Sequence, residues 1–444
     1  MLKTGRRLLG AAIAVTMFAG SAGAQLLPGI GLPPIALPAP VGNLPVAGPV
    51  LRNIASQPEA QQAIRPTLNT VAGLPERIAE SGASSLLELR KLRLKTLVRE
   101  NERVLETDDH GQPVRRGILV ALDPDPMSLQ VAQRSGFRLL ADERDPTLGM
   151  RMVKLAVPRG KSAPSALKLL ARVAPRMQAD YDHIYEPSGG SLAPVTAALA
   201  ASAGTAGGRA IGMIDGGVAS HPSLAGVRIE QSGFAGPPQP TGHGTAVASL
   251  LVGNQGKFRG AAIGSQLFVA DVYGGNRAAG SASAIVKALG WLAGHHPNVI
   301  NISLVGPANK LVARAVQIVQ SRGIQVVAAV GNDGPAAPPQ YPASYPGVLA
   351  ITAVDAHGRA LPEAGKAKHL DFAAPGADMA AALPGSGYAQ VRGTSFAAPL
   401  AAGRLLIAGS PARLAAEARP GKGRVGHGIV CGGCRIEPRA VGAK

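Results

Sequence analysis

The chain is poor in aromatic residues and in cysteine. Its 444 residues include seven Phe, six Tyr, one Trp and two Cys. Any buried core must therefore be built mainly from Ala, Val, Leu and Ile. The net charge is +18, yet the basic stretch after residue 400 holds no aromatic side chain that could stack on a base. The charge thus favours solubility or loose attraction to acidic surfaces, and no nucleic-acid partner is expected.

Long apolar runs are also missing after the first 25 residues, so no stable membrane span is expected. Three basic residues (Lys3, Arg6 and Arg7) precede a short apolar stretch, and Ala-Gly-Ala at 22–24 forms a cleavage pattern. Residues 1–24 are therefore predicted to be a signal peptide, which places the mature protein in a periplasm or outside the cell. The alternative is an uncleaved anchor, which the Gly and Ser residues from position 20 disfavour.

The rest of the first half divides into a linker, a helix and a small α+β unit. Residues 25–75 open with many prolines and predict a stiff linker. Leucines spaced among Arg and Lys over 76–112 predict an amphipathic helical segment, docked either on the protein itself or on a membrane surface. Residues 113–190 alternate in the order β-α-β-β-α-β, which is the ferredoxin-like pattern. A linker of small residues over 191–207 follows.

Residues 208–430 alternate short apolar strands with helices. This pattern predicts a doubly wound α/β fold, with a mostly parallel sheet and helices on both faces. Polar residues follow several of the predicted strands, among them Asp215, Ser303 and Asn332. Because sites in such sheets form at the carboxyl ends of strands, these residues are expected to lie at one edge.

Three glycine-flanked motifs hold one Asp, one His and one Ser: Ile214-Asp215-Gly216-Gly217, Gly242-His243-Gly244-Thr245 and Gly393-Thr394-Ser395-Phe396-Ala397-Ala398-Pro399. A serine hydroxyl is a weak nucleophile until a neighbouring base accepts its proton, and a histidine can do so near neutral pH. An aspartate can orient that histidine. Taken singly, each motif also fits a turn, a loop or a helix N-cap. Their conjunction favours nucleophilic catalysis.

The order Asp, His, Ser and the string around Ser395 resemble the subtilisin-like serine proteases, or subtilases. The sequence contains no His-Glu-x-x-His motif of a zinc protease. Ser395 also does not lie in the Gly-x-Ser-x-Gly motif of an α/β-hydrolase. The resemblance covers roughly residues 205 to 430 and implies a catalytic triad of Asp215, His243 and Ser395. It also implies an oxyanion hole made by the side-chain amide of Asn332 and the backbone N–H of Ser395.

The same resemblance implies that residues 113–190 are a ferredoxin-like prodomain that inhibits its own enzyme. Substrate-binding residues implied by it are Ser303, Leu304, Val305, Ala328 and Ala329, although Ser303 and the two alanines also fit a packed core. Small apolar walls would permit broad, apolar-leaning cleavage of protein or peptide substrates, and no acidic residue is clearly placed to select a basic side chain. No cofactor or metal is expected. Structural calcium occurs in the family, but no acidic cluster here has the spacing of a calcium loop.

Two features depart from the family pattern. Gly216 follows Asp215 where relatives commonly carry Ser or Thr, so a supporting hydroxyl is missing or comes from another group. Both cysteines, Cys431 and Cys434, lie in the basic tail over 431–444. In an exported protein a local disulfide between them is expected. A redox dithiol and a metal site that includes His427 are the alternatives.

Two functions therefore compete at the level of the sequence. The first is an exported serine endopeptidase that works through an acyl-enzyme, made as a self-inhibited precursor and activated by a cut near residues 186 to 205. The second is a non-catalytic binding protein that keeps the fold with its prodomain permanently attached. The complete Asp-His-Ser set favours the enzyme.

Overall fold

The computed structural model describes residues 78–188 and 208–443. The predicted signal peptide (1–24), the proline-rich linker (25–75) and the linker over 191–207 lie outside these residues. Within the described part, no helix combines the length and the apolar character that crossing a bilayer demands.

The predicted helical segment contains one long helix, α3 (Ile78–Glu100). Its Leu94 is buried, and Leu97 packs with Leu105 and Ile184 in a small apolar cluster. This helix thus docks on residues of its own chain. It leads through a turn into the short strand β1 (Leu105–Thr107).

Residues 105–183, the N-terminal module, fold into an antiparallel sheet in which the expected β-α-β-β-α-β order is present. Strand β5 pairs with β2, and the remaining order is β1-β2-β4-β3. Asp125 and Ser162 cap the two helices through their side chains, and a proline stands in the first turn of each. The elements are β2 (Pro113–Leu122), α4 (Pro126–Arg134), β3 (Arg138–Asp145), β4 (Met150–Ala156), α5 (Ala163–Val173) and β5 (Gln178–His183).

Residues 208–443, the C-terminal module, are built on a seven-stranded sheet in which every neighbouring pair is parallel. The order is β16-β15-β14-β12-β7-β11-β8, so the predicted doubly wound α/β fold is confirmed. The strands are β7 (Ala210–Asp215), β8 (Ile229–Gly233), β11 (Gln266–Asp271), β12 (Val299–Ile302), β14 (Gln325–Ala329), β15 (Leu349–Val354) and β16 (Phe372–Pro375).

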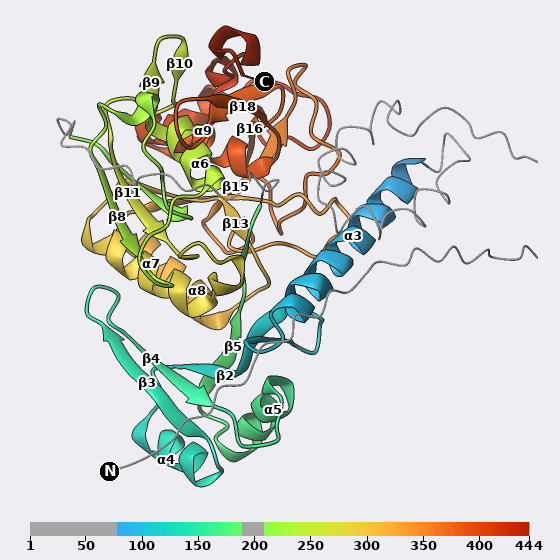
Figure 1. The fold of residues 1–444 in the computed structure, drawn as a ribbon, viewed down its shortest axis with the longest axis vertical. Helices are drawn as coiled ribbons and strands as arrows, with labels where there is room; N and C mark the ends of the chain where they lie inside the picture. The colour runs from blue at the N-terminus through green and yellow to red at the C-terminus, as the bar shows by residue number, and fades with distance from the viewer. Residues whose placement is uncertain (1–77, 189–207, 444) are drawn as a thin grey trace, which may run out of the picture. The chain divides into compact units, whose positions relative to one another are not determined.

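Helices cover both faces of this sheet. Helices α6 and α9 share one apolar core with Met213 and Val327, whereas α7 and α8 share the other with Ile214 and Val326. Neighbouring residues of a strand thus belong to opposite cores, because their side chains alternate between the two faces of the sheet. In Figure 1, α7 and α8 lie side by side on one side of the sheet. The helices are α6 (Gly242–Val252), α7 (Ala282–Gly294), α8 (Lys310–Ser321), α9 (Thr394–Ala408) and α10 (Pro411–Ala416).

Short strand pairs complete the module. Two antiparallel pairs lie outside the large sheet: β9 (Asn254–Gln255) with β10 (Phe258–Arg259), and β17 (Met379–Ala382) with β18 (Tyr388–Val391). A third pair joins β13 (Leu304–Val305) to β6 (Glu186–Pro187). Because β6 follows the N-terminal module, this last pair links the two modules.

Candidate active site

Asp215 is the last residue of the central strand β7, and its side chain is buried. One carboxylate oxygen accepts the backbone N–H of Gly216 at 2.7 Å. His243 lies in the first turn of α6, where Thr241 caps the helix. The Nδ1 atom of His243 is 2.9 Å from each carboxylate oxygen of Asp215. The structure therefore brings together the first two predicted site residues, 28 positions apart.

Ser395 lies in the first turn of α9 and is fully buried. The ring of Phe396, the next residue, is 5.3 Å from the His243 ring, centroid to centroid. Nε2 of His243 and Oγ of Ser395 are both buried and make no hydrogen bond to any described residue. Unpaired polar atoms are costly in a protein interior, so these two mark a place for a reacting partner.

Asn332 is held by its side-chain oxygen, which accepts the backbone N–H of Thr394 at 2.9 Å. The Thr394 hydroxyl in turn accepts the backbone N–H of Gly331 at 3.1 Å. These two bonds tie the Asn332 loop to the start of α9. Since the oxygen is engaged, the Asn332 amide nitrogen is the part of the side chain left to donate beside Ser395.

Thr241 occupies the space that the sequence leaves open at Gly216. A Cβ atom on Gly216 would lie 2.5 Å from the Thr241 hydroxyl oxygen. That hydroxyl accepts the backbone N–H of Gly244 and lies 3.3 Å from the carbonyl oxygen of Gly217, to which it donates. The Thr241 side chain, just before α6, thus fills the space that a side chain at position 216 would need.

The predicted substrate strand is already paired in this structure. Residues 184–188, the cleft segment, run between strand β13 and the Gly280–Ser281 segment of the C-terminal module. On one side, β6 pairs antiparallel with β13, and the Ser188 N–H donates to the Ser303 carbonyl at 3.0 Å. On the other side, the Tyr185 N–H donates to the Gly280 carbonyl at 2.7 Å.

Ser303 connects the cleft segment to the candidate nucleophile. Its hydroxyl donates to the carbonyl oxygen of Ser395 at 2.9 Å, while its own carbonyl accepts from Ser188. A single residue, Ser303, therefore links Ser188 to Ser395 through hydrogen bonds. The other implied wall residues, Ala328 and Ala329, are fully buried and pack into the two opposite cores of the sheet.

Tyr185 fills a pocket that the sequence did not reveal. Its side chain is fully buried, and its hydroxyl donates to the Pro307 carbonyl at 2.9 Å. A Cβ on Gly306 would lie 2.6 Å from the Tyr185 ring, so glycine there creates the space for the aromatic group. The Gly280–Ser281 and Gly306–Pro307 positions could have been suspected as glycine-lined walls, but only the fold places them opposite each other.

Asp271 is a second buried carboxylate that sequence reasoning missed. It ends β11, directly beside Asp215 in the parallel register. Burial raises the pKa of Asp271, and the charge of Asp215 acts in the same direction, against hydrogen bonds from the backbone N–H of Gln239, Tyr273 and Gly274. Its role in the structure is to bind these three N–H groups at 2.8 to 2.9 Å and so fix the loops around β7.

Asp333 directly follows Asn332, and the sequence predicted no role for it. It is buried, and its carboxylate binds Arg90 and Arg93 of α3. The acidic residue next to the candidate oxyanion residue is thus paired with two arginines of α3, which the sequence did not indicate.

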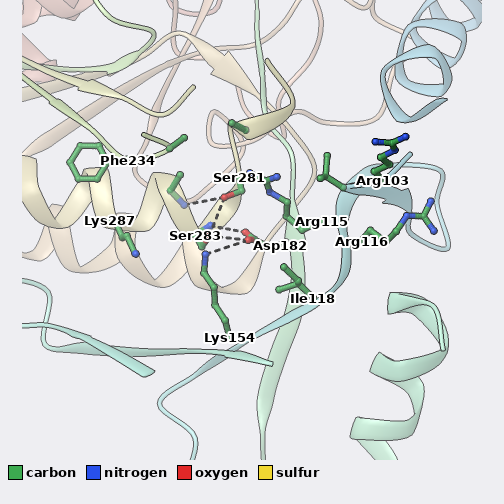
Figure 2. Close-up of a pocket in the computed structure, with 14 residues that line it drawn as sticks. Arg103, Arg115, Arg116, Ile118, Lys154, Asp182, Phe234, Ser281, Ser283 and Lys287 are labelled. Carbon is green, nitrogen blue, oxygen red and sulfur yellow. Dashed lines mark hydrogen bonds and ion pairs between the residues drawn. The ribbon is translucent and has the colours of Figure 1, made fainter. Parts of the chain in front are cut away.

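A cavity of about 310 Å³ lies where the N-terminal module meets the start of α7 (Figure 2). Asp182 of β5 accepts both the backbone N–H and the hydroxyl of Ser283, at 2.8 and 2.9 Å. Lys154 approaches the same carboxylate at 3.9 Å. This carboxylate joins the two modules at the first turn of a helix, where negative charge is favoured.

The two cysteines of the tail, Cys431 and Cys434, form a disulfide with their Cα atoms 5.2 Å apart. His427 packs its ring against Phe372. Among the residues that the structure describes, no group of three or more His, Cys, Asp or Glu side chains could hold a metal ion.

Comparisons with known proteins agree on one family. The model of the subtilase family matches residues 207–413. Subtilisin Savinase of Lederbergia lenta is 35% identical over 205 residues, which are 45% of this chain and 75% of Savinase. An alkaline protease of Alkalihalobacillus alcalophilus is also 35% identical over 205 residues, and 53% of its length is covered.

Among solved structures, fervidolysin from Fervidobacterium pennivorans, a keratinolytic enzyme related to subtilisin, aligns with a TM-score of 0.61 at 19% identity. The alignment covers 77% of this chain and 62% of fervidolysin, more of this chain than residues 207–413 can supply. It shows that the fold is shared. Together with the identity to Savinase, it leads to one conclusion: the chain belongs to the subtilase family and is a subtilisin-like serine protease.

Proposed function

We propose that this protein is an exported endopeptidase whose Asp215, His243 and Ser395 form the catalytic triad. Nε2 of His243 accepts the Ser395 proton as Oγ attacks the substrate carbonyl carbon. The protonated imidazole then gives that proton to the departing amine, and the C–N bond breaks to leave an acyl-enzyme. Water repeats the cycle and releases the acid product. The Asp215 carboxylate, at 2.9 Å from Nδ1, orients the imidazole and stabilises its positive charge.

The oxyanion is bound by the Asn332 amide and the Ser395 backbone N–H. Support comes from the hydrogen bond between Asn332 and Thr394, which holds the amide in place before substrate arrives. The start of α9 adds the positive end of the helix dipole where negative charge develops.

The cleft segment supports a self-inhibited precursor. It pairs with β13 as an extended substrate would, a mode that uses backbone hydrogen bonds and demands little sequence. Because Ser303 contacts both Ser188 and Ser395, the bond cut to release the N-terminal part is the one between Ser188 and Gly189. The signal peptide would deliver this precursor to a periplasm or to the medium.

The proposed specificity is broad, with a preference for an apolar or aromatic side chain at one position of the substrate. The buried Tyr185 shows the type of side chain that the pocket beside Gly306 accepts, three residues before Ser188. A peptide panel should therefore show higher kcat/KM for an aromatic or large apolar residue at that position. A strict demand for Arg or Lys before the cut would contradict this specificity.

One observation carries the proposal: a buried Asp215–His243 pair whose free ring nitrogen has no partner, with the Ser395 segment in contact with the imidazole. Purified wild-type protein should divide into two pieces and react with a fluorophosphonate probe. The Ser395→Ala chain should stay whole and unlabelled, and N-terminal sequencing of the larger wild-type piece should begin at Gly189. If exported wild-type protein also stays whole and unlabelled, the non-catalytic binding protein becomes the better interpretation.

A further inference from the structure

Helix α3 precedes the N-terminal module and carries arginines that contact the C-terminal module directly. Arg90 Nε lies 3.0 Å from one Asp333 oxygen. Arg93 binds the same carboxylate through two nitrogens, at 2.9 and 3.3 Å. These three residues, here named the arginine clasp, join a segment at the start of the described chain to the loop of Asn332.

The arginine clasp is partly sheltered from solvent. The Arg90 and Asp333 side chains are 8% and 6% exposed, whereas Arg93 is 44% exposed. Arg90 also donates to the Gln112 side chain at 2.8 Å, which fixes its guanidinium group. Leu86, one turn earlier on α3, packs against Gly334. Charge and apolar contact thus coincide on one loop.

Arg93 also reaches the cleft segment. Its Nε lies 3.2 Å from Glu186, and Arg277 of the C-terminal module approaches the same glutamate at 3.7 Å. One arginine therefore ties together α3, the strand in the cleft and the loop beside the candidate oxyanion hole. Glu186 is itself buried in this arrangement.

Within the described ranges, Asp333 has ion pairs only with α3. Among the described residues of the C-terminal module, none forms a hydrogen bond or ion pair with its side chain. Departure of α3 would break all of these ion pairs at once. The contact therefore opposes release of the N-terminal part.

We propose that the surface formed by Asp333 and Gly334 is a second docking surface of the enzyme, separate from the strand pairing in the cleft, and that its occupant is α3 of the same chain. This proposal rests on the proposed cut after Ser188. After that cut, the arginine clasp keeps the severed N-terminal piece bound. Dissociation of α3 then limits the appearance of free protease, and the N-terminal module alone does not determine inhibition.

The test uses the full-length chain with Arg90→Gln and Arg93→Gln together. After self-cleavage, the rate at which the two pieces separate is followed by size exclusion after dilution. We expect separation about 10²-fold faster or more than in wild type, the size expected for breaking a buried ion pair. The matched control is Lys91→Gln, since the Lys91 ion pair in the described part of the chain is with Glu88, on the same exposed face of the helix. Equal rates in wild type and the arginine variant would overturn the proposal.

A third variant tests whether the arginines act through Asp333. In Asp333→Asn the pieces should also separate faster, and adding the two arginine substitutions should change the rate by less than threefold. Independent, multiplying effects would show that the arginines act elsewhere and would contradict the clasp.

An arm without catalysis separates this proposal from the proposed function. In the uncut Ser395→Ala chain, backbone hydrogen exchange over α3 should be slow, and the two arginine substitutions should speed it at least tenfold while Lys91→Gln leaves it unchanged. Unchanged exchange in the arginine variant would refute the docking surface even if the enzyme cleaves itself. Conversely, faster exchange in the arginine variant, together with a wild-type chain that never cleaves itself, would support the surface and count against the protease function.

Discussion

At the scale of single residues, the site depends on side chains that hold one another rather than on isolated catalytic groups. Asp215 orients His243, Thr394 anchors Asn332, and Ser303 contacts both Ser188 and Ser395. Each partner comes from a different element. The consequence is that substitutions beside the triad should affect catalysis or folding in separable ways.

Asn332→Ala should lower kcat by about 10²–10³ while leaving KM nearly unchanged, because the lost amide binds charge that exists only in the transition state. Steady-state kinetics on a peptide amide substrate measure this. Asn332→Asp, which keeps the oxygen that accepts from Thr394 but removes the amide donor, is the control for lost anchoring. A rise in KM alone would contradict the oxyanion role.

Gly216→Ser should destabilise the fold by about 1–3 kcal/mol, because its Cβ would meet the Thr241 hydroxyl at 2.5 Å. Thr241→Ala should cost about 1 kcal/mol through the lost N-cap. The double variant should lose less stability than the two single variants lose in total, because the serine hydroxyl at position 216 occupies the space that the Thr241 side chain leaves. Urea unfolding of the two single variants and the double variant, all in the Ser395→Ala background, measures these stabilities. Strictly additive losses would show that the serine does not occupy the space left by Thr241.

At the scale of elements, the main feature is that β6, which follows the N-terminal module, pairs with β13 of the C-terminal module. Segment 184–188 lies between the Gly280–Ser281 segment and strand β13, so β13 has its partner before any substrate binds. Alternation of strands and helices predicted both modules, but no periodicity in the sequence indicates that β6 and β13 pair. Two residues make too short a strand to be recognised by pattern.

Tyr185→Ala should weaken the hold of the cleft segment by about 3–5 kcal/mol, the usual cost of emptying a buried aromatic site. The severed N-terminal piece should then inhibit the protease less well, which progress curves at rising enzyme concentration would reveal. Tyr185→Phe, which loses only the hydrogen bond to Pro307, should lie close to wild type. Equal inhibition by all three chains would exclude Tyr185 as an anchor.

At the scale of the whole molecule, the two modules are joined by apolar as well as polar contacts, since Val120, Met150 and Met152 belong to the same buried cluster as α7 and α8. Within the N-terminal module, Asp108 binds the backbone N–H of His110 and Gln112 at 2.8 Å, and His183 at 3.2 Å. Burial acts to raise the pKa of Asp108, but hydrogen bonds from His183 and these N–H groups outweigh it and hold the pKa below its ordinary value of 3.8. The ionised carboxylate is thus favoured in the fold.

A carboxyl group with a lowered pKa stabilises the fold fully above its ordinary value and loses this contribution as pH falls through the folded pKa. In the uncut Ser395→Ala background, Asp108→Asn should therefore be clearly less stable at pH 6, and the gap should narrow below pH 3.8. Urea unfolding between pH 2.5 and 6 measures the gap. Asp109→Asn, at an exposed neighbour paired with Lys168, is the control, and a gap that stays constant with pH would contradict this role of Asp108.

The sequence by itself determined what local pattern can encode: the alternation of strands and helices, and Asp215, His243 and Ser395 in glycine-flanked motifs. It did so because strand periodicity and motif chemistry are properties of neighbouring residues. The tertiary structure alone decided that Thr241 fills the space beside Gly216, that Tyr185 occupies a glycine-lined pocket and that Arg90 meets Asp333. These contacts join positions up to 243 residues apart, and such pairings follow from packing, which no local pattern records.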